Sequence, residues 1–254
     1  MIDNGQIVVP ALALRSPDGA AIDAEATARY AQRAARTWID AFILSGSTTR
    51  GDLLTIDERT DILDLWLRFA APARLVACCW CQDDLHEATR RAITPMVVMR
   101  SARSDEQALS LLASLPPSAY VYSHPKYDAR VLDVGLTVAA RRQGVLPAGA
   151  KLSKVTTADI TAIRRAAGPR WTLWDASSRH IDASFAAGAS GVVVSPLSHF
   201  PSPFPDRTLS ALQSTIDVVQ AQMDQLPSRD ARSQLLHELA KRHTVARALR
   251  TTVD

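Results

Sequence analysis

The chain has 254 residues, of which 47% are hydrophobic and 22% are charged. These fractions are typical of a globular protein, and no apolar run approaches the ~18 residues that span a bilayer, so we expect no disordered chain and no membrane partner. The net charge of +3 comes from 29 basic and 26 acidic residues that are largely interspersed. Phosphate binding needs basic residues gathered on one face, so the charge pattern argues against nucleic acid as a partner.

The N-terminal segment, MIDNGQIVVPALAL, contains an apolar run, as a secretory signal does. It has no basic stretch before its apolar run and no small-residue cleavage pattern after it. We therefore expect a cytoplasmic protein.

Short apolar runs alternate with longer amphipathic stretches eight times along the chain. Helices are predicted over 23–38, 55–70, 104–115 and 156–167, and two of them start with residues that favour a helix N-terminus. Thr55 has Glu58 three positions later, which is the capping-box spacing, and Ser104 is followed by two acidic residues. The eight predicted strands cover 7–14, 40–45, 74–80, 95–99, 119–123, 149–153, 171–175 and 191–195.

The strand pattern decides the fold class. Continuous apolar strands that are each followed by a helix are buried on both faces of a parallel sheet. Eight such units in a chain of this length predict an α/β protein with a single closed (β/α)8 TIM barrel. An open doubly wound sheet is the alternative, but only Gly19 occurs after the first strand, where a dinucleotide loop would need several glycines. We predict a barrel over 1–225 and a C-terminal helical extension over 226–254 packed on it.

All three cysteines lie in the segment ACCWC. Cys78 and Cys81 have the C-x-x-C spacing of a redox pair or half a zinc site, but no second pair exists. We therefore interpret Cys78, Cys79 and Cys81 as buried strand cysteines, and we predict no metal.

The active site of a TIM barrel is built from residues at the C-terminal ends of the strands. After the second predicted strand, Ser47, Thr48 and Thr49 form a turn that could hold a carboxylate or phosphate. An ordinary turn that leads into a helix is the alternative.

The fifth predicted strand places Tyr120 and Tyr122 on one side of the sheet. Tyr122 could relay protons at the barrel mouth, or could be a packed aromatic whose hydroxyl has a backbone partner. His124 follows it, and from this segment alone we favour a surface role for His124.

The sixth predicted strand carries a lysine within an apolar run. If charged and unpaired, Lys151 would cost several kcal/mol inside a barrel, so its pKa should fall and its amine become a nucleophile. The alternative is a lysine that extends along the rim into water. Lys154 lies where the strand ends, and we expect it to contact solvent.

Polar residues also follow the last two strands. They could line a polar pocket, but they are equally ordinary loop residues. These candidates are Asp175, Ser177 and Ser178 after the seventh strand, and Ser195, Ser198 and His199 after the eighth.

Four segments, taken in order, resemble one enzyme family. GSTTRGDLLTIDER, YSHP, GAKLS and AAGASGVVVS lie on strands two, five, six and eight, and together they resemble the dihydrodipicolinate synthase and N-acetylneuraminate lyase family. That family consists of (β/α)8 class I aldolases, usually tetrameric, which hold pyruvate or a related 2-oxo acid as a Schiff base. The resemblance covers most of the chain, and it implies a carbon–carbon lyase.

The resemblance also implies roles for individual residues. Lys151 would form the Schiff base, so that no separate cofactor is needed, and Tyr122 would shuttle protons with Ser47. Gly46, Ser47 and Thr48 correspond to the carboxylate-binding turn. The implied partners are a 2-oxo acid, an aldehyde and further copies of the chain in a dimer or tetramer.

The sequence departs from the family pattern near the site. Thr49 and Arg50 replace a glycine and a glutamate, Val97 replaces a tyrosine that completes a proton relay across a subunit interface, and Tyr127 replaces the arginine that holds the aldehyde's carboxylate in the synthase. These changes argue against a role in lysine biosynthesis. We expect an aldolase or lyase with another aldehyde.

The residues that would contact this aldehyde, or the substrate more generally, are Arg50, Lys126, His124 and Ser198. Two alternatives stay open at this point. One is a catalytically impaired barrel that binds a 2-oxo acid or has a structural role. The other is an unrelated barrel enzyme for a phosphorylated substrate, which would need a glycine-rich turn after the seventh or eighth strand.

Overall fold

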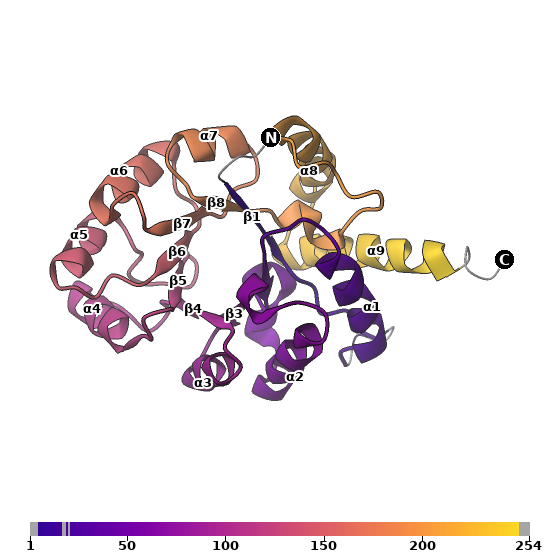
Figure 1. Cartoon of the computed structure of the whole chain (residues 1–254), viewed down its shortest axis with the longest axis horizontal. Helices are drawn as coiled ribbons and strands as arrows, with labels where there is room; N and C mark the ends of the chain where they lie inside the picture. The colour runs from indigo at the N-terminus through magenta and orange to yellow at the C-terminus, as the bar shows by residue number, and fades with distance from the viewer. Residues whose placement is uncertain (1–4, 17–18, 20, 249–254) are drawn as a thin grey trace.

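The computed structural model describes residues 5–16, 19 and 21–248, with side chains as far as 242. In these residues, eight parallel strands form a closed barrel in the order β1 to β8, with helices around it (Figure 1). Pairing of β1 with β8 closes the barrel, with Gln6 opposite Gly191. The predicted (β/α)8 TIM barrel is therefore confirmed. The strands are β1 (Gln6–Pro10), β2 (Ala41–Leu44), β3 (Leu75–Cys79), β4 (Thr94–Val98), β5 (Tyr120–Ser123), β6 (Gly149–Leu152), β7 (Thr172–Asp175) and β8 (Gly191–Val193).

An α-helix follows each strand, and an additional helix comes after the eighth, as predicted. The additional helix, α9, contacts α1 and two short 3₁₀ helices, η1 (Ser47–Thr49) and η4 (Ser195–His199). The α-helices are α1 (Ala24–Ala35), α2 (Ile56–Leu67), α3 (Gln82–Arg90), α4 (Asp105–Ser114), α5 (Val134–Arg142), α6 (Thr157–Ala167), α7 (Ile181–Ala186), α8 (Leu209–Asp224) and α9 (Arg229–Ala248). The shorter η2 (Gly51–Leu53) and η3 (Pro72–Arg74) complete the set. The division into a barrel and an extension at 225/226 stays a prediction.

The helix N-termini have the predicted capping residues. The Thr55 hydroxyl accepts a hydrogen bond from the Glu58 N–H, and the Glu58 carboxylate accepts one from the Thr55 N–H. Ser104 accepts from the N–H of Gln107 at the start of α4. These side chains satisfy N–H groups that the first turn of a helix leaves without a partner.

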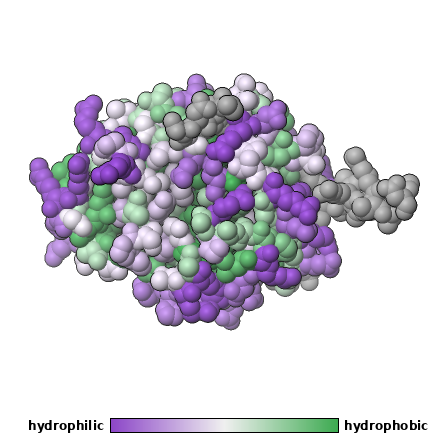
Figure 2. Space-filling model, viewed as in Figure 1, coloured by the Kyte–Doolittle hydropathy of each residue, from purple (hydrophilic) through white to green (hydrophobic). Residues whose placement is uncertain are grey.

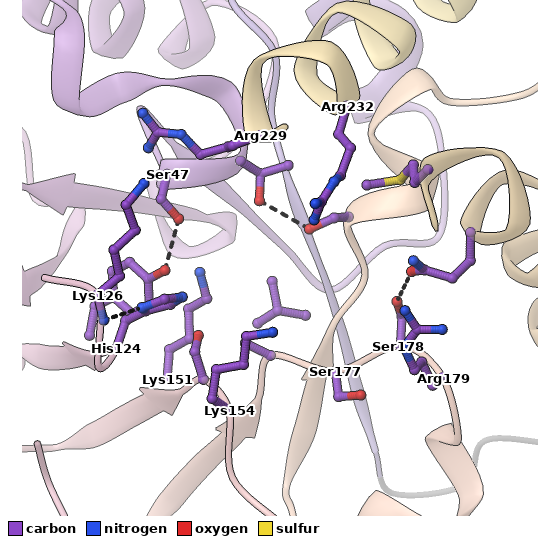
Figure 3. Close-up of a pocket in the computed structure, with 18 of the residues that line it drawn as sticks. Ser47, His124, Lys126, Lys151, Lys154, Ser177, Ser178, Arg179, Arg229 and Arg232 are labelled. Carbon is purple, nitrogen blue, oxygen red and sulfur yellow. Dashed lines mark hydrogen bonds between the residues drawn. The ribbon is translucent and has the colours of Figure 1, made fainter. Parts of the chain in front are cut away.

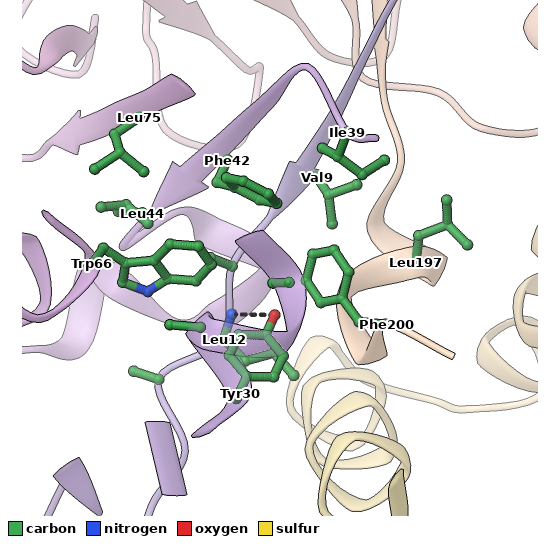
Figure 4. Close-up of a cluster of buried hydrophobic side chains, with 14 of the residues drawn as sticks. Val9, Leu12, Tyr30, Ile39, Phe42, Leu44, Trp66, Leu75, Leu197 and Phe200 are labelled. Carbon is green, nitrogen blue, oxygen red and sulfur yellow. Dashed lines mark hydrogen bonds between the residues drawn. The ribbon is translucent and has the colours of Figure 1, made fainter. Parts of the chain in front are cut away.

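The first strand is shorter than predicted. The apolar pattern runs over 7–14, but β1 ends at Pro10, where the chain leaves the sheet and crosses α1. Two of the next N–H groups bond to side chains of that helix. Leu12 donates to the Tyr30 hydroxyl at 3.0 Å (Figure 4), and Leu14 donates to the Thr27 hydroxyl at 3.0 Å. The segment is apolar because it is buried, and not because it pairs with a strand.

The interpretation of all three cysteines as buried strand residues was wrong for one of them. Cys78 and Cys79 are buried on β3, whereas Cys81 is exposed. Cys81 lies after the strand and serves as the N-cap of α3, where the chain turns toward the surface.

The main core lies between the barrel and its helices. Aromatic rings meet there, with centroids 5.0 Å apart for Phe42 and Trp66 and 5.4 Å apart for Tyr30 and Phe200 (Figure 4). The Phe42 and Phe200 rings also contact each other, so the aromatic cluster joins β2 and α2 to α1 and the end of η4. Leu236 of α9 belongs to the same buried cluster, so the C-terminal helix is part of the apolar core.

Alternate strand residues belong to different clusters, and this shows which side chains enter the barrel. On β5, Val121 packs outward with the helices, whereas Tyr122 belongs to the interior cluster. On β6, Ala150 and Leu152 both pack outward. Because successive strand residues point to opposite faces, Lys151 between them points into the barrel.

On the surface, the exposed large hydrophobic side chains are Leu53, Val134 and Val218, which lie on three different elements. Figure 2 shows hydrophilic residues gathered along the lower edge of one face and hydrophobic residues dispersed among them. Across the described helices, none has both the length and the apolar character that crossing a membrane requires. The oligomeric state stays a prediction.

Candidate active site

A cavity of about 510 Å³ opens at the C-terminal ends of the strands. Residues that follow β2, β5, β6, β7 and β8 line it, together with side chains from α8 and α9 (Figure 3). Its size lies within the range of about 300–1,000 Å³ that is typical of small-molecule sites. The cavity therefore lies where a TIM barrel places its active site.

Lys151 lies at the inner end of this cavity. Its side chain is 3% exposed, and its Nζ lies 3.9 Å from the centroid of the Tyr122 ring, which is opposite it on β5. Burial removes the ammonium group from water and lowers the pKa of Lys151 from 10.5 to about 8, although the nearby Cys78 opposes the change. About a tenth of the amine is therefore neutral at pH 7.

Tyr122 has its hydroxyl hydrogen-bonded to Ser47. The two oxygens are 2.8 Å apart, and both side chains are buried. Burial raises the pKa of Tyr122 to about 12, with the Ser47 hydrogen bond acting in the opposite direction. The phenol therefore keeps its proton at neutral pH and can donate it to a bound group.

A tight turn positions Ser47 and its neighbour. Gly51 donates its N–H to the Gly46 carbonyl at 2.9 Å, and a Cβ at position 51 would lie 1.7 Å from the Ser45 carbonyl oxygen. Only glycine fits there. The turn presents Thr48 to the cavity as well, where its hydroxyl lies 3.0 Å from that of Ser195 after β8.

Three predicted substrate-binding residues do not line this cavity. The Thr49 hydroxyl bonds to the Gly46 carbonyl within the turn, and Arg50 forms an ion pair with Asp230 at 2.9 Å. Ser198 is fully buried in η4. A short 3₁₀ turn sends successive side chains in different directions, so adjacent positions in the sequence do not share the site.

His124 and Lys126 line the cavity after β5. His124 is half-buried and faces the cavity, so its role in the site stays a prediction. Burial first, and then the positive charges of Lys151, Lys154 and Lys126, lower the pKa of His124 to about 4. The His124 Nδ1 accepts the Lys126 N–H at 2.9 Å, so the neutral ring carries its proton on Nε2.

Lys154 also lines the cavity, at its mouth. It is exposed, as expected, but its left-handed backbone, with φ of 63°, directs the chain from β6 across the opening. Figure 3 shows its side chain extending into the same space as Lys151. Lys154 therefore faces both the cavity and solvent.

Of the polar residues after the last two strands, some line the cavity and others do not. Ser177, Ser178 and Ser195 line the cavity. Asp175 does not: its carboxylate accepts hydrogen bonds from the Ser184 hydroxyl at 2.6 Å and the Ser177 N–H at 3.0 Å. His199 is buried, with Nδ1 2.8 Å from the Pro196 carbonyl oxygen. These two residues support the loops and do not form the cavity wall.

The cavity residues that the sequence did not suggest include Arg229 and Arg232, which α9 brings over the barrel mouth (Figure 3). Arg229 forms a bidentate ion pair with Asp52, with N–O distances of 3.0 Å, and donates to the Tyr127 hydroxyl at 2.6 Å. The available signal was a pair of arginines three positions apart, which lie on one face of a helix.

Comparison with known proteins adds information on the fold. Neither a family model nor a curated protein sequence matches the chain. Solved structures do match. Dihydrodipicolinate synthase from Agrobacterium tumefaciens aligns with a TM-score of 0.73 and 16% identity over 93% of this chain and 88% of that one.

Two further solved structures also align over most of the chain at low sequence identity. A variant of 2-keto-3-deoxygluconate aldolase from Sulfolobus solfataricus has a TM-score of 0.74 at 15% identity, over 93% of this chain and 86% of that one. YagE, an E. coli K12 prophage protein of the dihydrodipicolinic acid synthase family solved with pyruvate, has a TM-score of 0.67 at 16% identity, over 94% and 80%. The structural neighbours therefore come from the family that the sequence motifs resemble. At this level of identity the likeness shows a shared fold.

Proposed function

We propose that this chain is a class I aldolase or lyase, which forms a Schiff base with pyruvate or a related 2-oxo acid and makes or breaks a carbon–carbon bond to an aldehyde. The observation that carries the proposal is the Lys151 amine, which is buried at the inner end of the cavity beside the Tyr122 ring and has a pKa near 8. Lysines in this state act as nucleophiles toward ketones.

The geometry supports a defined sequence of steps. The hydroxyls of Ser47 and Thr48 would hold the carboxylate of the 2-oxo acid, so that its ketone faces Lys151. The neutral amine attacks the ketone carbon, Tyr122 protonates the resulting hydroxyl, and water leaves to give an iminium ion.

The iminium ion then withdraws electrons from the adjacent carbon. Loss of a proton from that carbon gives an enamine, which attacks the carbonyl carbon of an aldehyde, and the new alkoxide takes up a proton. Hydrolysis of the iminium releases the product and regenerates Lys151. In the reverse direction, the same steps cleave the bond. Tyr122, 2.8 Å from Ser47, would carry these protons, and no separate cofactor takes part.

The structural neighbours support this proposal, because their names include aldolases and one was solved with pyruvate. By the same likeness we propose a cytoplasmic homo-oligomer, either a dimer or a tetramer. The synthase reaction of lysine biosynthesis is not proposed. Tyr127, which occupies the position of the family's aldehyde-binding arginine, has its hydroxyl engaged by Arg229.

A direct test is to incubate the full chain with pyruvate and sodium borohydride and to map the reduced adduct by mass spectrometry. We expect one adduct, on Lys151, which is absent in Lys151→Arg and retained in the matched variant Lys154→Arg. If pyruvate and other 2-oxo acids give no adduct, the Schiff-base function is refuted. An adduct on Lys154 would show that the wrong lysine was chosen.

A second candidate is a barrel that binds a 2-oxo acid without turnover. Val97 favours it, because it stands where the family has the interface tyrosine and packs against the outer core, away from the cavity. The two candidates differ in one readout. An adduct on Lys151 without carbon–carbon bond formation for any aldehyde tested would favour the binding protein.

A further inference from the structure

The cavity is strongly biased toward positive charge. Asp224 is the one acidic residue in its described lining, and it is engaged by Arg179 at 2.6 and 2.8 Å. Arg229 is neutralised by Asp52. The basic residues of the lining are Lys126, Lys151, Lys154, Arg179, Arg229 and Arg232.

Three of these cations form no ion pair among the described residues, although the charge of Arg232 helps to lower the pKa of Asp224. Lys126, Lys154 and Arg232 are exposed, and none of them takes part in an ion pair within the described part of the chain. They come from three separate segments: the loop after β5, the loop after β6 and the first turns of α9. In Figure 3 the Lys154 amine and the Arg232 guanidinium both extend toward the space above Lys151.

The pKa of a neighbouring histidine agrees with a convergence of the lysine charges. After burial, the charges of Lys151, Lys154 and Lys126 lower the pKa of His124 to about 4. Like charges in a recessed site repel one another and raise the local positive potential. Such an arrangement is stabilised when an anion binds among the charges.

The lining of the cavity has a buried part and an exposed part. The inner half, which we define as Ser47, Tyr122 and Lys151, is buried and suits a small 2-oxo acid. The outer half, which we define as Lys126, Lys154 and Arg232, is open to solvent. Substrate atoms beyond the reacting carbons must therefore extend from the inner half into the outer half.

We propose that the outer half is an anion subsite, which binds a carboxylate or phosphate group on the aldehyde-derived part of the substrate, remote from Lys151. This rests on the proposed function and gives its substrate class: an acidic aldehyde in the synthetic direction, or a 2-oxo acid with a second anionic group in the cleavage direction. Arg232, in the next turn of α9 after Arg229, supplies a guanidinium from the C-terminal helix, and the two lysines add charge from the opposite wall.

A binding experiment tests the subsite without requiring turnover. Inorganic phosphate and succinate are titrated separately into the full chain by isothermal calorimetry at low salt. We expect saturable binding that weakens about tenfold in Arg232→Gln and in Lys154→Gln, since a charge-assisted hydrogen bond is lost. Arg242→Gln is the matched control, because Arg242 lies on the same helix and does not line the cavity. We expect its binding to equal that of the wild type.

The two anions identify the acidic group. Tighter binding of phosphate indicates a phosphate ester, and tighter binding of succinate a carboxylate. Absence of binding, or equal binding by the wild type, Arg232→Gln and Lys154→Gln, would overturn the subsite. The titration uses the unmodified protein, so it tests the subsite independently of Schiff-base formation. Failure of pyruvate to form an adduct on Lys151 would refute only the proposed function.

A turnover experiment tests the substrate class. With pyruvate as the donor, glycolaldehyde phosphate is compared with glycolaldehyde, and succinic semialdehyde with butanal, with the product quantified by mass spectrometry. We expect kcat/KM to favour the charged member of at least one pair by about tenfold or more, and Arg232→Gln to reduce that preference. Equal rates within both pairs would overturn the inference while leaving the aldolase intact.

Discussion

The inner and outer halves of the cavity are positioned in different ways. Tyr122 and Lys151 are adjacent in the register of β5 and β6, and both are buried. Their reacting atoms are therefore fixed by backbone hydrogen bonds and by close packing. The outer half is made of long, exposed side chains from two loops and α9.

Under the proposed function, the two halves of the cavity need different degrees of positional precision. Proton transfer and attack on a ketone need atoms placed within about 3–3.5 Å, and rigid strands provide that precision. Attraction of an anion acts over a longer range and tolerates side-chain movement. Under the proposed function, the barrel would therefore supply the chemistry, and the loops and C-terminal helix would select substrates by charge.

We expect the largest effect on the rate of adduct formation from removal of the Tyr122 hydroxyl. Tyr122→Phe removes the proton donor but keeps the ring beneath Lys151, so we expect the rate of adduct formation to fall by roughly 10²–10⁴-fold. Tyr120→Phe is the control, because Tyr120 lies two residues earlier on the same strand, packed against Trp174. Rapid quenching with borohydride measures the rate. Similar rates for the wild type and Tyr122→Phe would show that Tyr122 only packs.

The second effect concerns stability. Lys151→Met removes a buried amine whose pKa falls from 10.5 to about 8, so at pH 7 we expect the free energy of unfolding to increase by up to about 3 kcal/mol. Between pH 8 and 10.5 the unfolded state binds more protons at this site than the folded state does. The penalty therefore decreases as pH rises, and the two proteins should converge.

Urea unfolding at pH 7 and at pH 10 measures this difference. Lys154→Met is the matched control, because Lys154 is exposed, and we expect a change within about 0.5 kcal/mol at either pH. A Lys151→Met protein that is less stable than the wild type at pH 7 would contradict the cost assigned to burying this amine.

The rate of adduct formation should depend on pH through the pKa of Lys151. Only neutral Lys151 attacks a ketone, and its pKa is about 8. The initial rate of adduct formation with pyruvate should rise about tenfold per pH unit between pH 5.5 and 7 and level off above about pH 8.5. A rate that keeps rising to pH 10 would show an amine with the ordinary lysine pKa.

The smallest effect concerns how α9 is held over the outer half. Arg229→Gln and Asp52→Asn, measured singly and together by urea unfolding, should give a coupling free energy of about 1 kcal/mol, since this bidentate pair is partly buried. The exposed pair of Arg29 and Glu25 on α1 is the control, with an expected coupling of about 0.3–0.5 kcal/mol. Equal couplings would indicate that the Arg229 pair does not fasten α9.

The fold and the candidate residues of the inner half follow from local sequence patterns. Eight apolar runs alternating with amphipathic stretches require a parallel sheet covered by helices, and this pattern is local. Lys151 is identifiable because a cation within an apolar strand has few structural explanations, and Tyr122 because strand periodicity fixes its side of the sheet. The error at β1 arose because burial, and not strand pairing, made residues after Pro10 apolar.

The outer half depends on how distant segments pack. No local pattern shows that Arg232 would meet Lys154 at one opening, because the two residues are 78 positions apart in the sequence. The packing of α9 against α1 and η4 brings them together. The same folding turns Arg50 toward Asp230 and buries Ser198, although both looked like site residues. Secondary structure depends on short-range periodicity, whereas the charge lining a cavity depends on which distant segments pack together.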